Sequence, residues 1–209
     1  YIRAKKIVNK LRSFDVVQLI NENSFKTSPL LEIKLLKQIF QNNNNVFLLS
    51  CGVDSVSVKH AVSKKLKYSI LTPLFENASL KKKFKPILKY ERENYLALGK
   101  FVQEHVNGII SSDLDYHIPY FNKKKYLGMI PNPINIQKIK YYGINKSKKI
   151  SILHAINSSN KIKKGNKFFE EALEIIDKKF SSKINIITTY DLTYKEHLKN
   201  LKKCDILLD

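Results

Sequence analysis

Two series of alternating strand and helix patterns predict an α/β fold with two partial lobes. Short apolar runs typical of buried strands alternate with longer segments of helical periodicity, and the alternation restarts after Pro131 and Pro133. Strand–helix–strand units with connections of this length are typical of parallel sheets. We therefore expect a first lobe over residues 1–130 and a second over residues 131–209, both of them incomplete.

The first lobe is predicted from three apolar runs and the helical segments between them. The runs predict strands at residues 14–20, 46–49 and 106–111. Pro29 favours a helix start, and apolar residues recur after it with helical spacing until the Asn42–Asn45 run ends the helix. A longer helix is predicted from Pro86 onward. Its inward-facing residues are Leu88, Tyr95, Leu98, Phe101 and Val102. The two prolines within residues 128–135 argue against a regular helix or a central strand, so we predict a linker there.

The second lobe repeats the alternation. Strands are predicted at residues 150–155, 184–187 and 206–208, the last as a buried strand. A helix is predicted from Gly165-Asn166 to Phe180, with Lys178 and Lys179 in its last turn, where they complement the helix dipole. A second helix is predicted over residues 194–201.

The net charge of +20 comes almost entirely from lysine, because only three of the 38 basic residues are arginine. The lysines are spread along the whole chain, and abundant Lys, Asn and Ile are typical of an AT-rich genome. Arginine makes the better bidentate contacts to phosphate and guanine. We therefore predict diffuse, solvated charge and no nucleic-acid partner, while the excess charge could still favour anionic substrates or an anionic membrane face.

Cysteine content and hydropathy predict a soluble, cytoplasmic protein. Peripheral contact with the inner face of the membrane is compatible with this prediction. Cys51 and Cys204 lie far apart and fit reduced thiols. No apolar run has the roughly 20 residues that span a bilayer, and no signal-peptide pattern opens the chain. The start at Tyr1 and the apolar run before Asp209 lead us to expect a fragment of a longer protein.

The most informative segment is the loop between the predicted strand ending near His154 and the helix after Gly165. Ligands of open α/β sheets bind outside the carboxyl ends of the strands, and a helix N-terminus favours anions. Gly165 would let the backbone approach closely, and Lys161 and Lys164 would add positive charge. The pattern fits a diphosphate site, and it fits a solvated basic loop equally well.

Several short motifs, taken in order along the chain, resemble the group-one glycosyltransferases of the GT-B fold. They are the Ile130–Asn135 segment, the strand that ends in His154, Lys164-Gly165, the helix with Glu171-Ala172-Leu173, and the closing segment Lys203–Asp209. The resemblance implies two Rossmann-like lobes, a nucleotide-sugar donor on the second lobe, and contact of Lys161, Lys164 and Gly165 with its diphosphate. It also implies that Asn21, Gly52 and Asp54, at strand ends of the first lobe, face the acceptor.

The chain departs from this family at defined places. Lys161 stands where the family usually has an arginine, and Gln18 and Ile20 stand where many relatives have histidines. The family's paired glutamates would lie after Asp209 and its glycine-rich loop before Tyr1. We therefore expect no catalysis by this chain alone, and we assign no catalytic residue.

Three other patterns have simpler structural interpretations. Asp113 and Asp115 form the Asp-x-Asp pattern of metal-dependent glycosyltransferases, although acidic residues on such a loop are usually solvated. Asp54 is expected to cap a helix more readily than to face a cleft. His154 is expected to be a structural histidine.

The sequence thus predicts a glycosyltransferase that moves a sugar from a nucleotide-sugar donor to a glycan or lipid-linked acceptor, in a pathway such as cell-surface polysaccharide synthesis. We expect no metal and no cofactor apart from the donor substrate. The alternatives are another GT-B sugar-nucleotide enzyme, such as an epimerase, and a basic nucleic-acid-binding protein.

Overall fold

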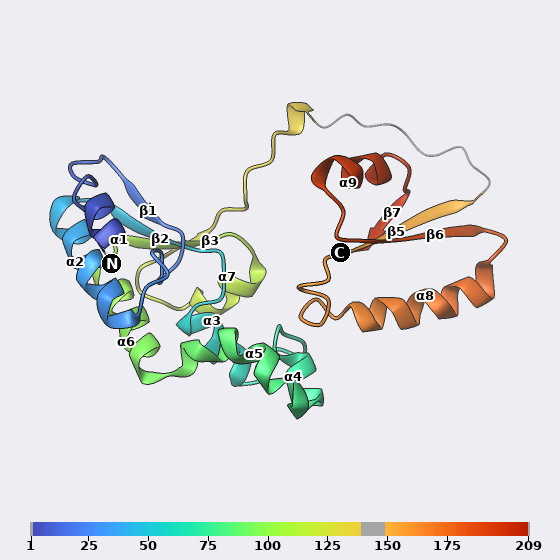
Figure 1. The fold of residues 1–209 in the computed structure, drawn as a ribbon, viewed down its shortest axis with the longest axis horizontal. Helices are drawn as coiled ribbons and strands as arrows, with labels where there is room; N and C mark the ends of the chain where they lie inside the picture. The colour runs from blue at the N-terminus through green and yellow to red at the C-terminus, as the bar shows by residue number, and fades with distance from the viewer. Residues whose placement is uncertain (1, 139–148, 209) are drawn as a thin grey trace. The chain divides into compact units, whose positions relative to one another are not determined.

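The computed structural model describes residues 2–138 and 149–208, and the chain divides into two compact units (Figure 1). The first unit comprises Tyr1–Ser69 and Ala78–Ile134, and the second comprises Ile70–Asn77 and Asn135–Asp209. Both units are α/β with parallel sheets, as in Rossmann-like folds. The predicted fold class is confirmed at this level.

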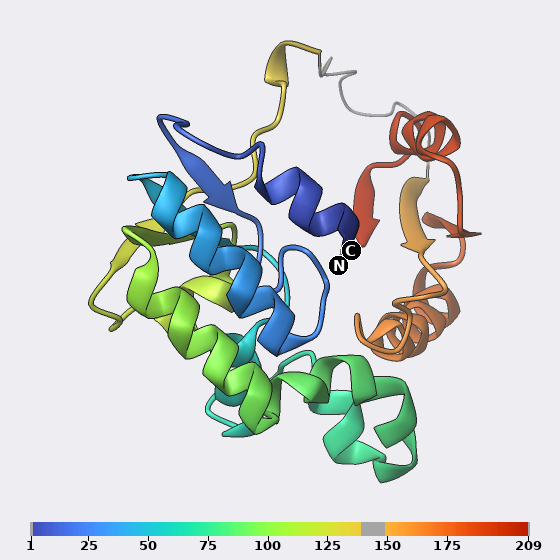
Figure 2. The same cartoon turned by 60° about the vertical axis from the view of Figure 1, so that its left-hand side comes forward.

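The first unit contains a four-stranded parallel sheet with the strand order β1-β2-β3-β4. Its strands are β1 (Val17–Leu19), β2 (Val46–Ser50), β3 (Gly108–Ser111) and β4 (Tyr126–Met129). Three helices, α1 (Ile2–Val8), α2 (Pro29–Asn42) and α6 (Glu93–His105), lie side by side over one face of the sheet (Figure 2). The core between these layers is aliphatic, with Leu36, Leu48 and Leu98 almost fully buried.

Short helices complete the first unit and its connections. They are α3 (Ser55–Val62), η1 (Ala78–Leu80), α5 (Lys81–Leu88), η2 (Lys89–Glu91) and α7 (Leu114–Tyr120). Two further helices, α4 (Thr72–Glu76) and η3 (Ile136–Lys138), belong to the second unit.

The second unit contains a three-stranded parallel sheet with the order β6-β5-β7. Its elements are β5 (Ile150–Ile156), α8 (Asn166–Phe180), β6 (Ile184–Tyr190), α9 (Tyr194–Leu201) and β7 (Ile206–Leu208). A small core joins α8 to the sheet through Ile152, Leu173 and Ile184.

The single helix predicted from Pro86 is wrong. The chain forms α5, which contains Pro86, and then a separate α6 that begins at Glu93. Arg92 between them is extended (φ −77°, ψ 145°), so the helical hydrogen-bond pattern cannot continue through it. Tyr90 is buried at this break, and its ring meets the ring of Tyr95 at 5.2 Å.

The predicted linker over residues 128–135 overlaps a strand. Tyr126–Met129 forms β4, which pairs with β3 through an irregular register between Ile109 and Ile110. Gly128, within the irregular strand, has φ +124°, a conformation that favours glycine. Both prolines follow the strand and remove no donor from its ladder.

The prediction for residues 206–208 is correct about the strand but wrong about its burial. The segment does form β7, but β7 lies at the edge of the sheet, where Ile206 and Leu207 are 45% and 44% exposed. The neighbouring strand β5 continues beyond His154 to Ile156.

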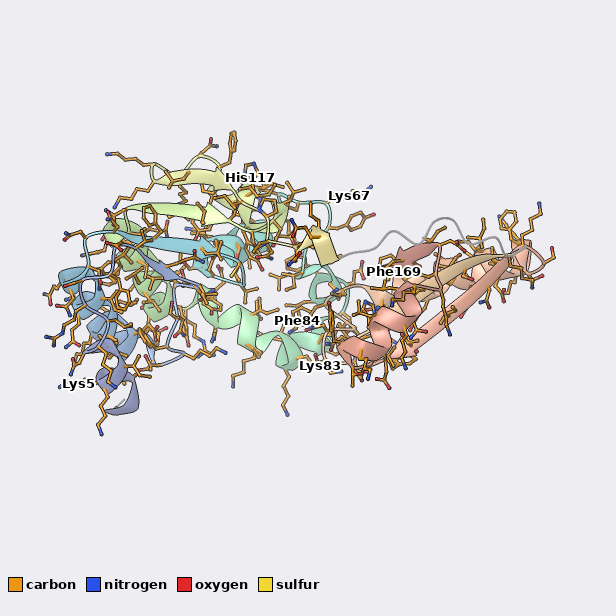
Figure 3. The ribbon with its side chains drawn as sticks, turned by 90° about the horizontal axis from the view of Figure 1, so that it is seen from above. Lys5, Lys67, Lys83, Phe84, His117 and Phe169 are labelled. Atoms are coloured by element: carbon orange, nitrogen blue, oxygen red, sulfur yellow. The ribbon has the colours of Figure 1, made fainter. Side chains whose placement is uncertain are left out.

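The lysines extend from many elements of the protein. Figure 3 shows this for Lys5 on α1 and Lys83 on α5, whose side chains point into solvent. Within the described part of the chain, no helix combines the length and the hydropathy needed to cross a bilayer.

Candidate functional site

A cavity of about 270 Å³ lies at the carboxyl ends of the strands of the second unit. Its lining comes from the last residues of β5, β6 and β7 and from the residues that follow β5 and β6. Two basic side chains join them, Lys164 from the loop before α8 and His197 from α9. This is the edge at which open α/β sheets bind ligands.

The loop before α8 is closed by its own backbone. Gly165 is the N-cap of α8 and has φ +67°, where a side chain would be strained. The N–H groups of Gly165 and Asn166 donate to the carbonyl oxygens of Ile162 and Lys161, each at 3.2 Å. These two donors are therefore used inside the loop, and the positive charge that this loop brings to the cavity lining is that of Lys164.

Lys161 is engaged beside the cavity and does not line it. Its Nζ lies 2.7 Å from Oε1 of Glu170 and 5.9 Å from the centre of the Tyr190 ring. The hydrogen bond to Glu170 raises the pKa of Lys161, which keeps the Lys161 ammonium protonated near neutral pH. Its contact with a diphosphate stays a prediction.

His154 is buried under the loop. Nδ2 of Asn166 donates to its Nε2 at 2.9 Å, and its ring packs 5.7 Å from the ring of Phe169. Burial lowers the pKa of His154, which favours the neutral imidazole. His154 thus ties the strand β5 to the first turn of α8, a structural role.

Asp191 and His197 were missed by the sequence analysis. Asp191 follows β6 with φ +47°, its N–H donates to the carbonyl of Ile156 at 2.9 Å, and its Oδ1 accepts from the N–H of Ser158 at 2.8 Å. Hydrogen bonds from Ser158 lower the pKa of Asp191. A polar residue directly after a strand was the available signal, whereas His197 lies on α9 and gave none.

In the first unit, Asn21, Gly52 and Asp54 come together where β1 and β2 end. Nδ2 of Asn21 donates to the carbonyl of Val53 at 3.2 Å, and a side chain added at Gly52 would meet the same Asn21 amide at 3.7 Å. All three lie on the loops that leave the carboxyl ends of their strands.

Asp54 is buried and fully hydrogen-bonded. It caps α3, with Oδ1 accepting from the N–H of Ser57 at 2.7 Å. Its Oδ2 accepts from the hydroxyls of Ser50 at 2.7 Å and Tyr120 at 3.0 Å. The side chain is thus used as a cap and as the centre of a buried polar cluster.

A second buried carboxylate, Glu22, was also missed. Its oxygens accept from the N–H of Ser55 at 2.9 Å and from the Ser55 hydroxyl at 2.8 Å. Burial, together with the charge of Asp54, raises the pKa of Glu22 to about 8. Gly99 on α6 makes room for this contact, because an added Cβ would lie 2.6 Å from Oε2 of Glu22 and would collide with the Ser55 hydroxyl.

Comparisons with protein-family models, with curated proteins and with solved structures find no match to this chain. Among residues 2–138 and 149–208, no group of three or more His, Cys, Asp or Glu residues is arranged to hold a metal ion. Asp113 of the Asp-x-Asp pattern is the N-cap residue of α7, although its side chain makes no capping hydrogen bond, and it accepts from the hydroxyl of Ser112 at 2.6 Å.

Proposed function

We propose that this chain is part of a GT-B glycosyltransferase that moves a sugar from a nucleotide-sugar donor to a glycan or lipid-linked acceptor. The observation that carries the proposal is the position of Lys164 in the lining of the cavity where β5, β6 and β7 end. The order of short motifs along the chain supports the same family, and so do the two parallel sheets.

The chemistry requires a fixed positive charge at this place. When the bond between the sugar and the diphosphate breaks, the diphosphate leaves with the bonding electrons and gains negative charge. A cation already held in position stabilises that charge without reorganisation. Lys164 supplies the charge in this proposal, and His197, which also lines the cavity, supplies a hydrogen bond.

The size of the cavity indicates which part of the donor it takes. Sites for whole small-molecule ligands usually have about 300–1,000 Å³. A cavity of about 270 Å³ is better matched to the diphosphate with an adjoining group than to a complete nucleotide sugar. In this proposal the sugar and the base extend beyond it.

Titration with nucleoside diphosphates, followed by calorimetry, tests the proposal. Lys164→Ala should weaken binding about tenfold, since one charge-assisted hydrogen bond contributes roughly 1.5 kcal/mol. Lys167→Ala is the matched control, because Lys167 is an exposed lysine of α8 that pairs with Glu171 at 3.5 Å outside the cavity. Unchanged affinity in Lys164→Ala would remove Lys164 from the role.

Two further results would redirect the proposal. Equal losses in both variants would show that the overall positive charge, and not this site, attracts the nucleotide. The epimerase alternative binds the same donor class, and incorporation of a labelled sugar into an acceptor by the complete enzyme, of which we propose this chain to be part, separates transfer from conversion of the free nucleotide sugar.

A further inference from the structure

A larger hollow lies in the first unit. It measures about 850 Å³ and is formed by α3, α6 and the segment from α7 to β4. Part of its lining is apolar and includes Val56, Leu96, Pro119 and the buried Ile109 of β3. Its volume is that of a site for a complete small molecule.

The hollow is much richer in lysine than the rest of the chain. Six of its fifteen lining residues are lysines, whereas lysine makes up 35 of the 209 residues. The frequency is more than twice the average of the whole chain. The six are Lys59, Lys65, Lys100, Lys123, Lys124 and Lys125.

Most of this charge is not compensated within the protein. Among the described residues of the lining, Glu104 is the one acidic residue, and its carboxylate lies 3.9 Å from Lys100. Nζ of Lys125 donates to the carbonyl oxygens of Glu104 and Val106 at 2.6 and 2.8 Å, at the end of α6. In the described part of the chain, the remaining four lysines have no carboxylate within ion-pair distance; these are Lys59, Lys65, Lys123 and Lys124.

The lining also includes one histidine, His60. Nε2 of His60 is shielded from solvent and has no hydrogen-bond partner among the described residues. Because solvent does not reach this atom, a ligand in the hollow does not reach it either, and it is the lysines that indicate a ligand.

We propose that this hollow binds a small organic polyphosphate. Four unpaired lysine charges match a ligand with two to four negative charges, and such a ligand relieves the repulsion between them. The organic part would lie against Val56, Leu96 and Pro119. The described residues of the lining include no arginine and no Phe, Tyr or Trp, the side chains with which proteins read or stack the bases of nucleic acids, so a small ligand fits better than a nucleic acid.

The test is calorimetric titration of the chain with ATP, used as the probe polyphosphate, at about physiological salt. The double variant Lys59→Ala/Lys124→Ala removes charge from two sides of the hollow. It should bind ATP about 20-fold more weakly, since an exposed charged contact contributes about four- to fivefold. Lys83→Ala/Lys85→Ala on α5 is the control, because both lysines are exposed and lie outside the hollow; it should bind like the wild type.

Tripolyphosphate tests the organic part of the proposal. Weaker binding of tripolyphosphate than of ATP is expected, because it lacks the group that contacts the apolar lining. Equal binding of the two would overturn the assignment of an organic ligand.

Three other results would overturn the assignment of polyphosphate binding to this hollow. Equal losses in the two double variants would mean diffuse attraction. A loss in Lys164→Ala that is absent from Lys59→Ala/Lys124→Ala would place ATP in the second unit, which would leave the donor-site proposal intact. Tighter binding of a ten-nucleotide RNA than of ATP, reduced equally in both double variants, would indicate a nucleic-acid surface.

Discussion

The carboxyl edges of the two parallel sheets are used in opposite ways. In the first unit, Glu22 and Asp54 lie at this edge, and their oxygens accept hydrogen bonds from neighbouring side chains and backbone. In the second unit, the edge leaves a cavity of about 270 Å³ with Lys164 and His197 in its lining. Two parallel sheets, with different strand orders, therefore carry a closed polar cluster in one unit and an open site in the other.

The difference shows that a polar residue at a strand end can have either of two roles: it can make hydrogen bonds inside the protein, or it can line a site for a ligand. Buried carboxylates are stable only when their oxygens are hydrogen-bonded, and Asp54 satisfies this with three internal donors. A carboxylate used in this way has little capacity left for a substrate. In the second unit, the cation of Lys164 is in the lining of a cavity, where a ligand can reach it.

Asp54→Ala gives the largest expected effect. The variant removes the cap of α3 and leaves the hydroxyls of Ser50 and Tyr120 without an acceptor, so it should lower the free energy of unfolding by about 4 kcal/mol. Urea denaturation measures the loss. Asp113→Ala is the control, because Asp113 is an exposed N-cap residue without a capping hydrogen bond, and it should lose far less. A loss of less than about 1 kcal/mol in Asp54→Ala would break the contrast between the two edges.

The second-largest expected effect is the change of the free energy of unfolding with pH. The pKa of Glu22 rises from its ordinary value of 4.5 to about 8 in the folded protein, so the folded chain keeps a proton that the unfolded chain releases. Stability from this group is fully present below pH 4.5 and is lost as the pH rises through 8, by up to about 1 kcal/mol per pH unit.

Glu22→Gln should flatten this slope, because the amide resembles the protonated acid and can still accept from the N–H of Ser55. Urea midpoints measured from pH 5 to pH 8 check it, with the exposed Glu93→Gln as control. A slope that persists in Glu22→Gln would assign the pH dependence to another group.

The sequence predicted the elements whose signals are local. Pro29 and the helical spacing after it placed α2, and the apolar face after Gly165 placed α8. It failed where a distant contact decides the outcome. Tyr126–Met129 joins the sheet because β3 offers a partner, and Arg92 interrupts a helical pattern where Tyr90 is buried.

The candidate sites show the same contrast between features with a local sequence signal and features that depend on distant contacts. Lys164-Gly165 was found because it follows a strand and precedes a helix within a few residues. The contact of Glu22 with Ser55 joins residues 33 positions apart and depends on the absence of a side chain at Gly99 on α6, so no local pattern predicts it. The hollow of the first unit likewise combines lysines from three separate segments.

Lys161→Ala gives the smallest expected effect and sharpens the description of the second edge. Lys161 and Glu170 are 39% and 33% exposed, and ion pairs at such positions add little to stability, so the melting temperature should stay close to that of the wild type. Because the pair holds Lys161 beside the cavity, nucleoside diphosphates should bind this variant more tightly than they bind Lys164→Ala. Calorimetry on both variants measures the difference, and Glu170→Gln is the complementary change. If Lys161→Ala loses as much affinity as Lys164→Ala, and Glu170→Gln gains affinity, the ion pair opens on binding and both lysines hold the diphosphate.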